Sequence, residues 1–66
     1  MAAADVAELS SLSSMLSDLE HRIVSLAGKW DGKDRDDVIA MLHEAERQLR
    51  GANRALANAR KAVERG

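Results

Sequence analysis

Hydrophobic residues recur along the first half of the chain at alternating intervals of three and four positions. They are Leu9, Leu12, Leu16, Leu19, Ile23, Leu26 and Trp30. A second run in the other half has the same uninterrupted spacing and consists of Val38, Leu42, Ala45, Leu49, Ala52, Leu56, Ala59 and Val63. This spacing is that of the a and d positions of a coiled coil, whereas strands alternate at every second residue. The pattern predicts two long amphipathic α-helices.

The residues that flank the two runs indicate where the helices begin and end. Asp5 followed by Glu8 resembles a capping box, so the first helix is expected to begin at about residue 5. Gly32 can adopt the left-handed conformation that ends a helix, and Gly28 is a competing stop. Asp34 can then cap the second helix.

The register of the two runs decides between the glycines. In an antiparallel pair the numbers of facing residues share a constant sum, and a sum of 68 pairs seven layers, from Trp30 with Val38 to Leu9 with Ala59. The first helix must then continue through Trp30, which favours Gly32 as the stop. We expect one domain, 1–66, with helices over about 5–31 and 35–64 and a turn at about 32–34. The fold class is all-α, an antiparallel two-helix hairpin with the two runs as its core seam.

Apolar residues outside this seam predict a partner. Three d positions of the second helix are Ala45, Ala52 and Ala59, and the neighbouring g positions are also mostly small. A second surface is therefore expected at Met15, Met41, Ala55 and Ala62. Two helices alone cannot cover both the seam residues and the apolar residues outside the seam. The simplest solution is a homodimer that forms a four-helix bundle. A heterodimer with a similar hairpin satisfies the same pattern.

Composition excludes several kinds of chemistry. There is no Cys, hence no disulfide or thiolate metal site, and there are only two histidines, His21 and His43, both outside the seam. No catalytic residues, metal ligands or cofactor-binding motif are found, so we expect no enzyme and no cofactor. Serines gather on the first helix, away from the predicted seam, as polar filler or as sites of modification: Ser10, Ser11, Ser13, Ser14 and Ser17.

Charge is distributed unevenly along the chain. Residues 1–46 hold four basic and ten acidic side chains, whereas residues 47–66 hold six basic and one acidic. Arg47, Arg54 and Lys61 share one helical position and form a basic stripe. Such a stripe can follow a nucleic-acid backbone, but no aromatic residue accompanies it. We expect it instead to complement the helix dipole and the acidic first helix, with no nucleic-acid binding.

The segment Trp30-Asp31-Gly32 resembles the WXG family of small type VII secretion substrates, the early-secreted-antigen type. The preceding Ser11-Leu12-Ser13-Ser14-Met15-Leu16, Ile23 and Leu26-Ala27 are similar to the approach to the turn in that family, so the resemblance covers the middle third of the chain. It implies pairing with a similar hairpin and export. The chain is shorter than family members and has no Tyr for their Tyr-x-x-x-Asp/Glu export signal.

No segment resembles a signal peptide, and no apolar run approaches the roughly 20 residues that span a bilayer. A cytoplasmic location without a membrane is therefore expected, with type VII export as the alternative. Taken together, these features favour a small non-enzymatic interaction module, an adaptor or regulatory subunit that acts as a dimer. A WXG-like secretion substrate or its pairing partner is the second hypothesis, and a nucleic-acid-binding helical dimer is the third.

Overall fold

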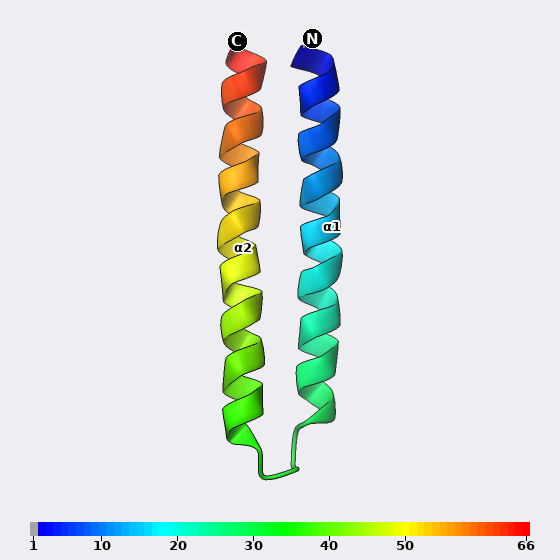
Figure 1. Cartoon of the computed structure of the whole chain (residues 1–66), viewed down its shortest axis with the longest axis vertical. Coiled ribbons are helices and arrows are strands. Elements are labelled where there is room, and N and C mark those ends of the chain that lie inside the picture. The colour runs from blue at the N-terminus through cyan, green and yellow to red at the C-terminus, as the bar shows by residue number, and fades with distance from the viewer. Residues whose placement is uncertain (1) are drawn as a thin grey trace.

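The computed structural model describes residues 2–66, and for Ala2 the backbone alone. These residues form two α-helices and no strand, with α1 spanning Ala2–Lys29 and α2 spanning Asp36–Arg65. The helices run side by side in opposite directions, so that both termini lie at the end away from the turn (Figure 1). The Cα atoms occupy a rod of 51 × 14 × 9 Å. The predicted all-α hairpin is confirmed.

The first helix begins earlier than the sequence suggested. Because α1 starts at Ala2, Asp5 lies within its first turn rather than at the N-cap. A carboxylate in the first turn still interacts favourably with the helix dipole. The capping box is therefore not formed as predicted, but the acidic residue keeps a stabilising position.

The last turn of α1 tightens before the chain reverses. The backbone N–H groups of Trp30 and Asp31 donate to carbonyls three residues earlier, at 3.1 and 3.3 Å. Gly32 then takes a φ of +77°, a conformation that costs a residue with a Cβ about 1–2 kcal/mol. The left-handed conformation predicted for Gly32 is confirmed.

Asp34 does not cap the second helix. It has a φ of +56°, while the residue that precedes α2 is Arg35, which makes no side-chain cap hydrogen bond. An N-cap residue normally has an extended backbone, which a positive φ excludes. The predicted cap is therefore wrong. Arg35 instead forms a two-pronged hydrogen bond with the Asp37 carboxylate, at 3.0 Å for both contacts.

The seam of α1 is rotated relative to the predicted one. Leu9, Leu16, Ile23 and Trp30 are half-buried, as a seam requires. The other predicted members, Leu12, Leu19 and Leu26, are exposed, and the residues that follow them in the chain, Ser13, Glu20 and Ala27, take their place. These three leucines, predicted to lie between the two helices, remain 38%, 40% and 44% exposed.

The second helix is rotated in the same sense. Its half-buried residues include Val38, Leu42, Ala45, Leu49, Leu56 and Val63. Ala52 and Ala59, predicted for the seam, are exposed, and Asn53 turns toward α1 beside Ala52. Polar pairing across the seam gives the physical reason for the rotation, because Asn53 hydrogen-bonds to serines of α1.

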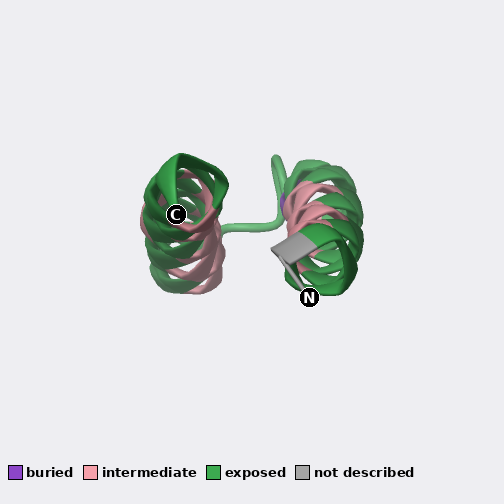
Figure 2. Cartoon of the chain, turned by 90° about the horizontal axis from the view of Figure 1, so that it is seen from above, coloured by how far each residue is buried: buried purple, intermediate pink, exposed green. Residues whose placement is uncertain are grey.

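The hairpin buries very little. Among the described residues only Ala27 is buried, at 4% exposure, and no large side chain is fully covered. Half-buried residues line the sides by which the helices approach each other, and exposed residues cover the remainder (Figure 2). The core is thus one narrow seam.

Candidate interaction face

Large apolar side chains are exposed in a row along α1. Leu12, Leu19 and Leu26 are seven residues apart, so they project from α1 in nearly one direction, and Met15 lies beside them at 60% exposure. A shallow hollow along this row is lined by Leu19, Arg22, Ile23, Ser25, Leu26 and Lys29. The row is apolar, and its three leucines remain 38–44% exposed.

A row of mostly small residues is exposed along α2. Met41, at 69% exposure, begins it. Its further members recur three or four positions apart and are Gln48, Ala52, Ala55, Ala59 and Ala62. The side chains predicted as a partner surface, Met15, Met41, Ala55 and Ala62, are therefore all exposed in the hairpin.

Both rows lie on one face of the hairpin. In each helix the exposed row precedes the seam residues by one position, for example Leu12 before Ser13 and Ala52 before Asn53, which is a rotation of about 100°. Because the helices are antiparallel, a rotation in the same sense about each helix direction leads to the same side of the pair. We call this surface, formed by both rows, the apolar face.

The opposite side of the hairpin is the polar face. Its hollow near the turn contains residues that follow seam positions, Val24 and Gly28 from α1 with Ile39 and His43 from α2. Residues that directly follow seam residues in the two helices therefore meet on one side of the hairpin. This supports the placement of the residues that precede the seam on the other side. The polar face exposes Val24, at 52%, as its large apolar side chain on α1.

A polar layer crosses the middle of the seam. The hydroxyl of Ser13 donates to Oδ1 of Asn53, and Nδ2 of Asn53 donates to Oγ of Ser17 at 3.0 Å and to Oε2 of Glu20 at 3.4 Å. The paired residue numbers total 66 for Ser13 and 70 for Ser17, on either side of the predicted 68. The layer thus fixes the axial register, and the four residues are half-buried.

Comparison of this chain with protein-family models, with curated proteins and with solved structures found no match. Its function is therefore argued from the faces of the hairpin.

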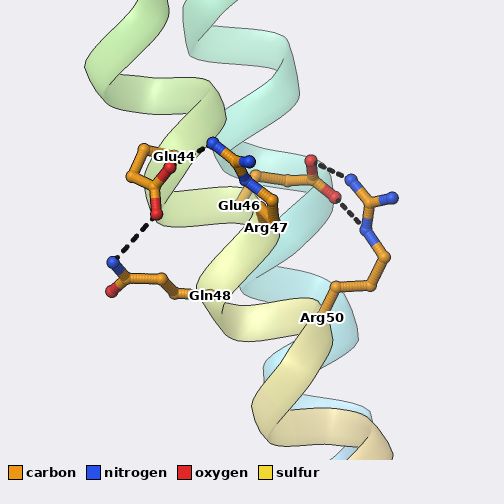
Figure 3. A network of polar contacts seen from close by, with 5 residues as sticks. All are labelled: Glu44, Glu46, Arg47, Gln48 and Arg50. Carbon is orange, nitrogen blue, oxygen red and sulfur yellow. Dashed lines mark hydrogen bonds and ion pairs between the residues drawn. The ribbon is translucent and has the colours of Figure 1, made fainter.

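Polar contacts of glutamates mark the two edges of α2. Figure 3 shows Glu44 with Gln48 on one side of the helix and Glu46 with Arg50 on the other. Nε2 of Gln48 donates to Glu44 at 3.1 Å, and Nε of Arg50 donates to Glu46 at 3.0 Å. Glu46 is the more covered carboxylate, its side chain being 14% exposed, and it raises the pKa of Arg50. Gln48 belongs to the apolar face, and Glu44 borders it.

The basic stripe remains on the outer surface of α2. Arg47, Arg54 and Lys61 are exposed, and Arg47 pairs with Glu44 of its own helix. The ion pairs found within residues 2–66 each join residues of one helix or its adjoining turn. The expectation that these basic side chains face acidic α1 thus finds no supporting pair.

The remaining predicted residues fall outside any chemical cluster. His21 and His43 are exposed, and the described part of the chain holds no group of three or more side chains able to bind a metal ion. Within that same part, neither helix has the length and apolar content needed to cross a membrane. Ser11 and Ser14 are exposed, but Ser10, Ser13 and Ser17 are half-buried, which corrects the expectation that the serines lie away from the seam.

At the turn, charge and aromatic contacts meet. The Arg35 guanidinium lies 6.0 Å from the centre of the Trp30 ring, within range of a cation–π contact. Its hydrogen bond to Asp37 raises the pKa of Arg35 and lowers the pKa of the Asp37 carboxyl. Sequence reasoning missed this arrangement and the Asn53 layer. A signal for Asn53 was present, because a lone Asn beside an apolar seam commonly fixes helix register.

Proposed function

We propose that this chain is a non-enzymatic helical-hairpin interaction module, an adaptor or regulatory subunit, that acts as a homodimer through its apolar face. The observation that carries the proposal is the small core: among residues 3–66, Ala27 alone is buried, while a row of leucines is exposed. Two apolar faces in contact make a four-helix bundle with a central core.

The exposed area supports association quantitatively. The hairpin exposes 5002 Å², whereas a folded monomer of this mass exposes roughly 4,100 Å². The difference of roughly 900 Å² is close to the area that each partner buries in a standard-size interface, about 800 Å². A second chain is therefore sufficient to bring the exposed area to a normal value.

The choice of seam residues supports the same proposal. The hairpin places Ser13 and Glu20 between its helices and leaves Leu12 and Leu19 exposed. Fully burying a Leu side chain contributes about 1.5–3 kcal/mol, so an isolated hairpin lacks part of this stabilisation at each exposed leucine. A partner on the apolar face recovers it.

A charged residue in the centre of the apolar face tests the proposal. Leu19→Lys should convert the dimer to a monomer in sedimentation analysis, because a lysine there would be desolvated in the interface. His21→Lys adds the same charge to an exposed position of α1 that lines no hollow, and should leave the dimer intact. A wild-type chain that sediments at its monomer mass at all concentrations would contradict the proposal.

A second candidate is a WXG-like hairpin that pairs with a different hairpin and is exported by a type VII system. Supporting it, Trp30 and Gly32 lie at the turn, and Gly32 has the left-handed backbone there. This candidate expects a chain that is poorly helical alone and gains helicity when a second hairpin protein is added. The homodimer proposal instead expects that the wild-type chain is helical without any other protein and stays in the cytoplasm.

A further inference from the structure

The two rows of the apolar face differ in side-chain size. The α1 row consists of leucines with Met15, whereas the α2 row is mostly alanine after Met41. We infer that the apolar face is covered by a second copy whose α2 lies on α1 of the first, with the two turns at the same end of the bundle. This inference rests on the proposed homodimer and specifies how its two chains meet.

Size alternation favours this arrangement. When α1 of one copy faces α2 of the other, the leucine row packs against the mostly small row, whose alanines lie away from the turn and whose larger members, Met41 and Gln48, lie nearer to it. If each helix instead faced its own equivalent, leucine would oppose leucine on one side and alanine would oppose alanine on the other. The helix axes would then need two different separations within one flat interface.

The register follows from symmetry. A two-fold axis along the rod keeps every residue at its own height, so the sum that relates α1 to α2 within a chain also relates them between chains. Residues whose numbers total about 68 then stand at the same height in the two chains, and the pairs of exposed residues nearest to this value total 67. On this basis Leu12 opposes Ala55 of the second copy, Leu19 opposes Gln48, and Leu26 opposes Met41.

Charges at the edge of the face agree with this register. Arg22 and Lys29 border the hollow on α1, and Glu44 and Asp37 border the apolar face on α2. The residue numbers total 66 in both possible pairs, Arg22 with Glu44 and Lys29 with Asp37. Opposite charges of the two chains thus lie at similar heights along the bundle. The Arg22 side chain is 73% exposed and its contact with Asp18 is long, at 3.9 Å, whereas Glu44 and Asp37 also pair with Arg47 and Arg35 of their own chain. Exposed pairs of this kind orient partners more than they stabilise them.

Disulfide trapping tests the arrangement, because the chain has no Cys of its own. Two variants with one cysteine each, Leu12→Cys and Ala55→Cys, are mixed in a glutathione redox buffer, and the products are identified by mass. A mixed disulfide should form in large excess over either self-linked product. A mixture of Leu26→Cys and Met41→Cys should behave alike. Each variant is first checked for wild-type helicity by circular dichroism, and the second pair provides the test if one variant of the first does not fold.

Two controls make the result specific. Ser14→Cys mixed with Arg54→Cys places cysteines at matching heights on the outer sides of the helices and should give no excess of mixed product. Ala52→Cys alone reports the competing arrangement, since α2 on α2 would bring residue 52 close to its equivalent. Dominant self-linking of Ala52→Cys, or the absence of both mixed disulfides in a chain that sediments as a dimer, would overturn the inference. A monomeric wild-type chain would instead contradict the homodimer itself.

Discussion

At the scale of single residues, Asn53 does the most to define how the helices meet. Its amide contacts Ser13, Ser17 and Glu20 of the opposite helix, so one side chain joins positions across about two turns of α1. A hydrogen bond adds only about 0.5–1.5 kcal/mol to stability, but an unpaired half-buried group costs more. The layer therefore contributes register and rotation as much as stability.

Replacing this amide should show its contribution. Asn53→Ala removes the hydrogen bonds and leaves two serine hydroxyls without their partner, while Asn58→Ala changes the same residue type at an exposed position of α2. Alanine favours the helix in both, so their difference isolates the polar layer. Asn53→Ala should be less stable than Asn58→Ala by about 1–2 kcal/mol in urea unfolding. Equal stabilities would show that the layer contributes nothing.

The Arg35–Asp37 pair at the turn predicts a dependence on pH. Because the pKa of Asp37 is lowered in the folded chain, its contribution to stability is present above the ordinary carboxyl value of about 3.9 and is lost as the pH falls through the folded-state pKa. In an NMR titration Asp37 should have a midpoint below that of an unperturbed Asp. Arg35→Gln should return the midpoint upward. An unchanged midpoint in this variant would exclude the guanidinium as the cause.

At the scale of elements, glycine is unfavourable inside a helix but favourable in the turn. Gly51 lies inside α2 on its outer surface, and a Cβ added there would meet no atom within 4 Å. Gly32 has equal space around it, but its φ is +77°. Space is thus available at both positions, and only the backbone distinguishes them.

Alanine at these two glycines should have opposite effects. Gly51→Ala should raise the free energy of unfolding by about 1 kcal/mol through helix propensity. Gly32→Ala should lower it by about 1 kcal/mol because the left-handed conformation is unfavourable with a Cβ. Thermal unfolding of both variants at one protein concentration measures the difference. Destabilisation by Gly51→Ala would mean that a second chain packs against the outer surface of α2.

The sequence predicted the existence, type and direction of both helices because their apolar spacing has no slip. It also predicted the left-handed conformation of Gly32, because ending the helix there requires a positive φ, which glycine adopts most readily. It did not predict the rotation of the seam. Leu12 and Ser13 are both adjacent to Leu9 and Leu16 on the helix surface, and apolar spacing selects the leucine. The structure selects the serine because Asn53, forty residues away, offers it a hydrogen bond.

The candidate face was predicted in part for the same reason. Met15, Met41, Ala55 and Ala62 were assigned to a second surface because they lie outside the apolar run, and all four are exposed. Leu12, Leu19, Leu26, Ala52 and Ala59 were assigned to the seam, yet they extend this surface. The apolar stripe of each helix is broader than one neighbouring helix can cover. Tertiary contacts therefore determine which edge of the stripe is buried.

At the scale of the whole molecule, the hairpin has two unlike sides. The side of the polar face carries the hydrogen bonds of Asn53 and the Glu46–Arg50 ion pair. The apolar face exposes large residues of α1 beside small residues of α2. A chain of 66 residues with a single narrow seam has little stability of its own, because conformational entropy offsets most of the burial. The proposed association would supply the missing core.

The concentration dependence of unfolding tests this account most directly. If folding and association are one process, the thermal midpoint followed by circular dichroism should rise steadily with protein concentration, because mass action favours the assembled state. Light scattering on the same samples should give about twice the 7.2 kDa mass of the chain. A cooperative transition whose midpoint does not change with concentration, in a species of monomer mass, would contradict the account.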